Sequence, residues 1–368
     1  MPPIRILIVD DSVVIRKVLT DALAGDPAVE VAGTASDGRL ALAKVGQLKP
    51  DILTLDVEMP NMSGLETIKE IRKSHPKLPI IMFSTLTERG ATTTLDALAL
   101  GASDYVTKPS NTGSLDVTML RIKEDLLPKI KALCGRGFGD KKPTFPPAKP
   151  PQPVAVAERA KARIEVLAIG TSTGGPNALA EVIPAIPADF PVPIVIVQHM
   201  PKLFTRLLAE RLDKASAISV HEGEPGKKIE PGHAWIAPGD FHMVLERRAA
   251  GIHLAMNQNA PENSCRPAVD VLFRSVAATF GANTLAVVLT GMGSDGVIGS
   301  QAVREKGGRV YVQDEASSVV WGMPGQTAAA GFADNIYPLR NIAVEIDRHV
   351  RASRLSQSST LGKPIGVK

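Results

Sequence analysis

The sequence has little cysteine, few aromatic residues and no long apolar run. Its two cysteines, Cys134 and Cys265, lack the spacing of metal ligands, so we expect free thiols in a reducing compartment. No stretch reaches the ~18 apolar residues that a membrane-spanning helix needs. The opening MPPIRILIVDDS is not typical of a signal peptide. These absences exclude a disulfide-rich secreted protein and direct membrane insertion, and they predict a cytoplasmic location.

The sequence also has only a small excess of basic over acidic residues. The net charge is +4 at pH 7, and no long Lys/Arg block occurs, so we expect no nucleic-acid partner. The sequence does have 44% hydrophobic and 22% charged residues over 368 positions. That length and composition suit two globular domains with substantial cores.

The first part of the chain, residues 1–133, alternates strand-like and helix-like patterns. Its strand-like runs cover 4–10, 29–35, 51–56, 79–84 and 104–107, and helical patterns lie between them and over 114–133. Alternation of this kind predicts a parallel sheet wrapped by helices, here a (βα)5 domain.

A change of composition then separates two α/β regions. Residues 134–163 are rich in Pro, Gly, Lys and Arg, which predicts an extended linker. We expect a second α/β domain over 164–354 and a polar tail over 355–368. Strand-like runs of the second domain cover 165–170, 193–198, 233–238, 242–246, 285–290 and 309–314, and its helical patterns lie around 176–183, 203–213, 268–279 and 296–306. The short spacing of 233–238 and 242–246 predicts an antiparallel hairpin inside a doubly wound, mostly parallel sheet.

Charged and hydroxyl side chains gather at predicted strand ends in residues 1–133. Asp10 and Asp11 follow the first strand, Asp56 and Ser84 end the third and fourth, and Lys108 follows the fifth. In an open parallel sheet these ends meet at one edge. Carboxylates that meet there need a cation, and hard oxygen ligands suit Mg²⁺, whereas lysine suits a phosphate. The set predicts a carboxylate that accepts a phosphoryl group, although a strand-terminal Asp can also simply cap the next helix.

The motifs DDS, LDVEMPNMSG and TKP resemble the response-regulator receiver family, which has a flavodoxin-like fold, over residues 1–125. The resemblance implies phosphorylation of Asp56, with Mg²⁺ as the cofactor of that reaction. The implied Mg²⁺ ligands are Asp10, Asp11, Asp56 and the backbone carbonyl of Glu58. The implied phosphoryl-contact and switch residues are Ser84, Lys108 and Tyr105.

The stretch IGTSTGGP joins a predicted strand to a predicted helix. A phosphate-binding P-loop would need Lys where Pro176 stands, and a dinucleotide fingerprint would need Gly in place of Ser172, so an unusual anion site is one alternative. The other is a nucleophile site. His199 directly follows one predicted strand and Asp295 lies five residues past another, so both can join Ser172 at the same sheet edge. There the three side chains could form a Ser-His-Asp triad.

Five motifs carry a second resemblance. IGTSTGGP, VQHMP, RPAVDVLFRS, LTGMGSDG and VQDEASSVVWGMP, after a receiver-like segment and a linker, resemble the chemotaxis protein-glutamate methylesterase (CheB) family. The resemblance implies a catalytic serine hydrolase domain with Ser172 as nucleophile, His199 as base, Asp295 as orienting acid, the Met292 amide in the oxyanion hole and Thr173 supporting His199. This sequence departs from the family at Thr171, Ser294 and Gly325-Gln326, and the last pair could alter receptor contacts.

The second resemblance implies a function. It is a phosphorylation-regulated hydrolase that removes glutamate 5-methyl esters, releases methanol, and deamidates specific glutamines on the cytoplasmic domains of chemotaxis receptors. A chemotaxis histidine kinase would be the phosphodonor, and the esterase would need no cofactor. Two other classes fit less well. A DNA-binding response regulator would carry a small basic helical module in the second half, and a non-catalytic scaffold would lack a triad member.

Overall fold

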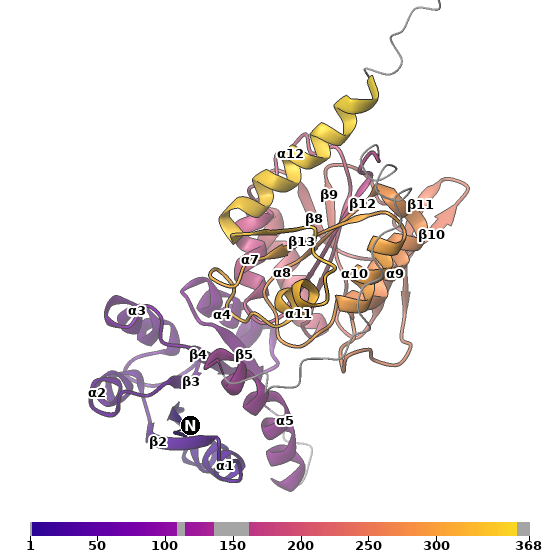
Figure 1. The fold of residues 1–368 in the computed structure, drawn as a ribbon. Coiled ribbons are helices and arrows are strands. Elements are labelled where there is room, and N and C mark those ends of the chain that lie inside the picture. Colours follow the sequence, from indigo (N-terminus) through magenta and orange to yellow (C-terminus); the bar gives the residue numbers. More distant parts are fainter. Residues whose placement is uncertain (1, 109–114, 136–161, 359–368) are drawn as a thin grey trace, which may run out of the picture. The chain divides into compact units, whose positions relative to one another are not determined.

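The computed structural model describes residues 2–108, 115–135 and 162–358, and the chain divides into two compact units, Met1–Lys141 and Lys142–Lys368 (Figure 1). Each unit is an alternating α/β domain. Most of the predicted linker, 136–161, lies outside the described residues. The predicted domain boundaries therefore stay a prediction.

The first unit contains a parallel sheet of five strands in the order β2-β1-β3-β4-β5. Its strands are β1 Ile4–Val9, β2 Val29–Ala35, β3 Ile52–Asp56, β4 Ile80–Ser84 and β5 Asp104–Thr107, and its helices are α1 Val13–Ala24, α2 Gly38–Leu48, α3 Gly64–Ser74, α4 Glu88–Ala99 and α5 Leu115–Leu133. β3 and β4 are buried throughout because helices cover both faces of the sheet. From β1 the chain goes first to β2 on one side and then to β3 on the other, so the strand order changes direction between β1 and β3. Ligands of such sheets bind at the carboxyl ends of the strands beside this point.

Polar residues fix where the helices of this unit begin. The Ser12 hydroxyl accepts a hydrogen bond from the Ile15 amide at the start of α1. Ser63 and Glu66 form a reciprocal capping box at the start of α3. These caps satisfy backbone amides that have no partner within the helix. They therefore fix the residue at which each helix begins after the loop at the sheet edge.

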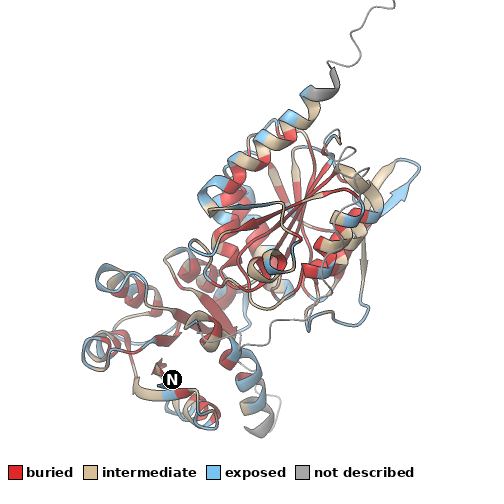
Figure 2. Cartoon of the chain, viewed as in Figure 1, coloured by how far each residue is buried: buried red, intermediate tan, exposed pale blue. Residues whose placement is uncertain are grey.

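The second unit is built on a sheet of seven strands in the order β14-β13-β12-β6-β7-β9-β8, all paired in parallel. The strands are β6 Val166–Thr171, β7 Ile194–Gln198, β8 Ser219–Glu222, β9 His233–Ile236, β12 Thr284–Val288, β13 Arg309–Gln313 and β14 Asn335–Tyr337. Its helices are α7 Gly175–Val182, α8 Lys202–Ala215, α9 Val269–Phe280, α10 Val297–Glu305, α11 Met323–Ala329 and α12 Leu339–Ser358, with a 3-10 turn over Gly281–Asn283. The central strands are buried on both faces, as Figure 2 shows, and the mostly parallel α/β fold is as predicted.

The antiparallel hairpin exists, but it forms a separate two-stranded sheet and does not lie inside the central sheet, and the predicted strand pair was wrong. β9 pairs in parallel with β7 and β8, whereas the hairpin joins β10 His242–Arg248 to β11 Gly251–Asn257. The HAWI run of β9 is apolar and mostly buried, so it enters the central sheet. Gly251, the first residue of β11, has φ +125°, a conformation that suits glycine.

Several elements were not predicted from sequence. They are β8, β11, the 3-10 turn, α11, β14 and α12. Helix α12 continues to Ser358, beyond position 354 where the polar tail was expected to begin, and residues 359–368 lie outside the described part. None of the helices in the described ranges is both long enough and apolar enough to cross a membrane.

Candidate active site and phosphorylation site

Three carboxylates meet at the ligand edge of the first unit. One oxygen from each of Asp10, Asp11 and Asp56 lies within 4.8 Å of the others. Asp10 and Asp56 are buried and Asp11 is exposed. The Lys108 ammonium lies 3.0 Å from Asp10 Oδ2 and 2.8 Å from Asp56 Oδ2. The structure thus brings together the predicted acids and the predicted lysine.

The electrostatics of this cluster follow from burial. Burial and the charge of Asp10 raise the pKa of Asp56 to about 6, against the opposing effect of Lys108. Burial disfavours the Lys108 ammonium, but the hydrogen bond to Asp56 and the charges of both acids outweigh it and raise its pKa. Lys108 offsets part of the acids' repulsion. Their oxygen atoms are the donors that a hard divalent cation such as Mg²⁺ prefers.

The two predicted switch residues lie on neighbouring strands. Ser84 ends β4, and its hydroxyl donates to the carbonyl of Gly90, 3.2 Å away. Tyr105 lies on β5 and is 6% exposed. Burial, followed by the charge of Asp104, raises the pKa of its hydroxyl. The phenol therefore stays neutral at physiological pH.

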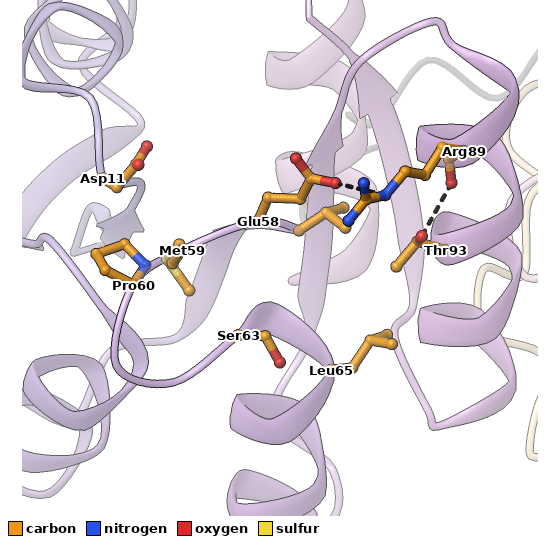
Figure 3. Close-up of a pocket in the computed structure, with 9 residues that line it drawn as sticks. Asp11, Glu58, Met59, Pro60, Ser63, Leu65, Arg89 and Thr93 are labelled. Atoms are coloured by element: carbon orange, nitrogen blue, oxygen red, sulfur yellow. Dashed lines mark hydrogen bonds and ion pairs between the residues drawn. The ribbon is translucent and has the colours of Figure 1, made fainter.

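An open pocket of about 610 Å³ adjoins the acid cluster (Figure 3). Its lining residues are Asp11, Val57, Glu58, Met59, Pro60, Ser63, Leu65, Arg89 and Thr93. The exposed Glu58 side chain forms an ion pair of 3.2 Å with Arg89 across this pocket. Because Asp11 belongs both to the pocket and to the acid cluster, the pocket gives solvent and small ligands a route toward the carboxylates.

In the second unit, the topology brings the three candidate triad residues to one edge. Strand β6 lies between β7 and β12, and all three run in parallel. Ser172 directly follows β6, His199 directly follows β7, and Asp295 lies in the loop between β12 and α10. The winding of the sheet switches direction beside β6, because β7 lies on one side and β12 on the other. Ligands of doubly wound sheets bind at such a point.

The His–Asp half of the candidate triad is fully formed. His199 Nε2 lies 2.8 Å from Asp295 Oδ2. His199 Nδ1 lies 3.5 Å from the Cys265 sulfur. Ser172 is partly buried, and its backbone amide donates to the Thr290 carbonyl at 3.1 Å. Its carbonyl accepts from the Gln198 side-chain Nε2 at 3.0 Å. Within the described ranges, no hydrogen bond joins the Ser172 hydroxyl to His199, as is common in hydrolases without substrate.

The two glycines after the serine are required by close packing. Gly174 has φ +79°, and a Cβ there would lie 2.6 Å from Cβ of Val319. A Cβ on Gly175 would lie 2.0 Å from the Gln198 side-chain oxygen and 2.4 Å from the Thr171 hydroxyl. The glycines therefore let the serine loop sit directly against its neighbours, and no phosphate need be invoked to explain them.

Gly174→Ala should destabilise the second unit and depress activity. A left-handed conformation costs an L-residue about 1–2 kcal/mol, and the contact with Val319 adds to this. Chemical denaturation and turnover of the full chain test the expectation. Gly232→Ala is the matched control, because Gly232 has φ +80° with open space around its Cβ. Equal losses in both variants would contradict a special packing role for Gly174.

Burial and neighbouring charges shift the pKa values of three groups at the candidate triad, His199, Asp295 and Asp270. Burial opposes protonation of His199, but Asp295 and then Cys265 outweigh it and raise its pKa to about 10. Burial likewise opposes ionisation of Asp295, yet the His199 hydrogen bond and backbone amides lower its pKa. Burial and the charge of Asp295 raise the pKa of the neighbouring Asp270 to about 6. Asp295 therefore favours the protonated form of His199, and a second buried acid, Asp270, lies behind the pair.

The contacts of the two predicted supporting residues, Thr173 and Met292, do not by themselves show the predicted roles. Thr173 is buried, and its carbonyl accepts from the Thr290 hydroxyl at 3.0 Å. Met292 is partly buried in the Gly291–Gly293 turn, where Gly293 has φ +87°. Their roles toward His199 and the oxyanion remain predictions.

Sequence reasoning missed three residues that touch the His–Asp pair: Asn263, Cys265 and Asp270. For Asp270 a signal existed, because a lone acid stands in the apolar run AVDVLF that begins α9. Asn263 and Cys265 lie in a loop whose approach to the sheet edge only the tertiary structure shows.

The fold and sites together define a class: a response-regulator receiver domain joined to an α/β serine hydrolase domain. Residues 6–119 match the response regulator receiver domain family, and residues 167–346 match the CheB methylesterase family. The chain belongs to the family of two-domain CheB methylesterases.

Relatives and a solved structure support this assignment. The protein-glutamate methylesterase/protein-glutamine glutaminases of Trichodesmium erythraeum and of a Nocardioides species are each 51% identical to this chain. The alignments cover 95% and 97% of this chain and 100% and 98% of those proteins, respectively. The crystal structure of the Thermotoga maritima CheB methylesterase catalytic domain matches 51% of this chain and 99% of that one, at 41% identity and a TM-score of 0.50.

Proposed function

We propose that this chain is a phosphorylation-regulated protein-glutamate methylesterase and protein-glutamine deamidase that acts on chemotaxis receptors. The contact of His199 with Asp295, at the strand ends that also carry Ser172, is the observation that carries the proposal. The names of the full-length relatives supply the substrate class.

Ser172, His199 and Asp295 would share the work of ester cleavage. Because Asp295 binds His199 Nε2, Nδ1 is the ring nitrogen that remains to accept the serine proton. The Ser172 oxygen attacks the ester carbonyl, and His199 then gives the proton it took from Ser172 to the departing methoxide, which leaves as methanol. Water hydrolyses the resulting glutamyl ester of Ser172 by the same proton route. The same acyl chemistry serves a glutamine amide, with ammonia as the leaving group.

Backbone amides would stabilise the oxyanion. We assign this role to the Met292 amide, because Met292 sits in a glycine turn beside the nucleophile: a Cβ on Gly291 would lie 2.9 Å from the Ser172 Cβ. We assign Thr173 to the support of His199. The esterase chemistry as written needs protein groups and water alone.

In the receiver, Asp56 would accept the phosphoryl group from a chemotaxis histidine kinase. Asp10, Asp11, Asp56 and the Glu58 carbonyl would hold Mg²⁺, which offsets the negative charge of the incoming phosphoryl group. Ser84 and Lys108 would contact that group and Tyr105 would respond to it. The described acid cluster supports this assignment through its three carboxylates and its bridging lysine.

Methanol release from methylated receptor membranes tests the proposal. We expect release by the purified full chain, faster when a small phosphodonor and Mg²⁺ are present. Absence of methanol with properly methylated membranes would overturn the substrate assignment.

The esterase rate should rise with pH through the neutral range. His199 must be neutral to act as a base, and Asp295 and Cys265 hold its pKa above 6.5, so each increase in pH enlarges the neutral fraction. The measurement is kcat/KM between pH 6 and 9.5, with the Ser172→Ala variant as the blank for alkaline hydrolysis. A profile that is flat from pH 6.5 upward would contradict the raised pKa.

A further inference from the structure

A tight turn, Glu262–Cys265, lies against the His–Asp pair. Its ends exchange two backbone hydrogen bonds, Glu262 amide to Cys265 carbonyl at 3.1 Å and Cys265 amide to Glu262 carbonyl at 2.8 Å. Both central residues have positive φ, +51° at Asn263 and +61° at Ser264, as in a type I′ turn. The Glu262 carboxylate also accepts from Arg274 of α9 at 2.6 Å. The turn is thus strained in its backbone and anchored to the catalytic domain.

Asn263 bridges two buried carboxylates. Its side-chain amide donates to Asp295 Oδ1 at 3.0 Å and to Asp270 Oδ2 at 2.9 Å. Asp295 and Asp270 are 2% and 1% exposed, so their repulsion is weakly screened. An asparagine amide has two N–H groups and can donate to both acids at once.

The two acids are otherwise held by the beginnings of two helices. Asp295, which lies just before α10, accepts from the first amides of α9, Val269 at 2.7 Å and Asp270 at 2.9 Å. Asp270, in the first turn of α9, accepts from Gly296 at 2.9 Å and Gly299 at 2.6 Å at the start of α10. Each acid caps the other's helix. Backbone amides of the two helices thus bind both carboxylates from the interior. Asn263 of the turn binds them from the solvent side.

The same turn also reaches the histidine. The Cys265 sulfur lies 3.5 Å from His199 Nδ1, the nitrogen left over once Nε2 is bound to Asp295. The Ser172 hydroxyl must meet this nitrogen in the productive complex. Cys265 therefore orients the imidazole in the site without substrate, and the Ser172 hydroxyl takes its place at Nδ1 in the productive complex.

We propose that the Glu262–Cys265 turn positions the catalytic pair, with Asn263 acting on Asp295 and Cys265 acting on His199. This inference rests on the proposed esterase function. Without Asn263, the two carboxylates lose their shared donor, and Asp295 loses the side-chain hydrogen bond to Oδ1 that helps to fix its orientation toward the imidazole. The loss affects the chemical step, because Asn263 acts through Asp295.

Asn263→Gly is the first test, because glycine tolerates the left-handed backbone and removes the amide. We expect kcat for methanol release to fall about 10–100-fold, the size of a lost charge-assisted hydrogen bond, with KM nearly unchanged. Asn263→Asp keeps the shape but adds a third carboxylate, and it should lose more. Ser264→Gly suits the positive φ of the same turn and keeps both contacting side chains, Asn263 and Cys265, so it should behave like wild type. Wild-type kcat in Asn263→Gly, or equal losses in Ser264→Gly, would overturn the proposal.

Cys265→Ala supplies a readout that a purely structural role would not move. The titratable groups in contact with the imidazole are Asp295 and Cys265, and Asp270 lies behind Asp295. Removing the thiol should shift the rising limb of the kcat/KM profile to lower pH. If the rising part of the kcat/KM profile stays at the same pH in Cys265→Ala, Cys265 does not act on His199.

Labelling of Ser172 by a fluorophosphonate probe separates this inference from the proposed function. If wild type is labelled but releases no methanol, the substrate assignment fails. Labelling rates of the Asn263 variants then still test the turn, and slower labelling in Asn263→Gly than in Ser264→Gly would support it. Equal rates would count against it.

Discussion

Ser172→Ala should abolish methanol release from methylated receptors while the protein stays folded. Loss of the nucleophile of a Ser-His-Asp triad typically costs ~10⁴-fold or more in rate. The change removes one partly buried hydroxyl and leaves the backbone contacts of Ser172 with Thr290 and Gln198 in place. Gas-phase or coupled detection of methanol, together with a thermal unfolding curve, measures both effects.

The matched control is Ser294→Ala. Ser294 is another partly buried hydroxyl residue, directly before Asp295, and we give it no part in the chemistry. It should retain activity within a few-fold of wild type. Near wild-type turnover in Ser172→Ala would contradict the triad and would favour the alternative that the serine loop is an anion site.

Asp56→Asn should eliminate stable phosphorylation of the chain and its stimulation by a phosphodonor. Asparagine keeps the shape of the side chain but lacks the carboxylate nucleophile. The basal esterase rate should persist, because the substitution leaves the candidate triad untouched. Incorporation of labelled phosphate from a histidine kinase, with and without a chelator of Mg²⁺, measures the first effect. Methanol release with a small phosphodonor measures the second.

Asp21→Asn controls for the change in charge. Asp21 is an exposed acid on α1 that pairs with Lys17 at the surface, 3.0 Å away. Its variant should be labelled like wild type. Label retained on Asp56→Asn at the wild-type level would place the phosphorylation site elsewhere.

Strand ends explain why so much of both sites could be predicted. Asp56 ends a buried apolar run and His199 follows one, and a parallel sheet brings such ends to one edge whatever the loops do. Sequence periodicity therefore predicted the meeting of acids around Lys108 and the approach of His199 to Asp295. It was less successful where an apolar run could pair in more than one way. The hairpin was assigned to β9 and β10 because they are close in sequence, but β9 pairs with β7 and β8.

The sequence by itself determined the alternating α/β architecture, the residues that end its strands, and the family to which they belong, because these depend on local periodicity and short motifs. The tertiary structure alone decided which nitrogen of His199 meets Asp295, why Gly174 must be glycine, and how Asn263 reaches two acids. These features depend on contacts between segments far apart in the chain: Asn263 lies 32 positions from Asp295, and Cys265 lies 66 from His199. No local pattern specifies such contacts. They arise when helices α9 and α10 begin side by side and carry the loops before them to the edge of the sheet.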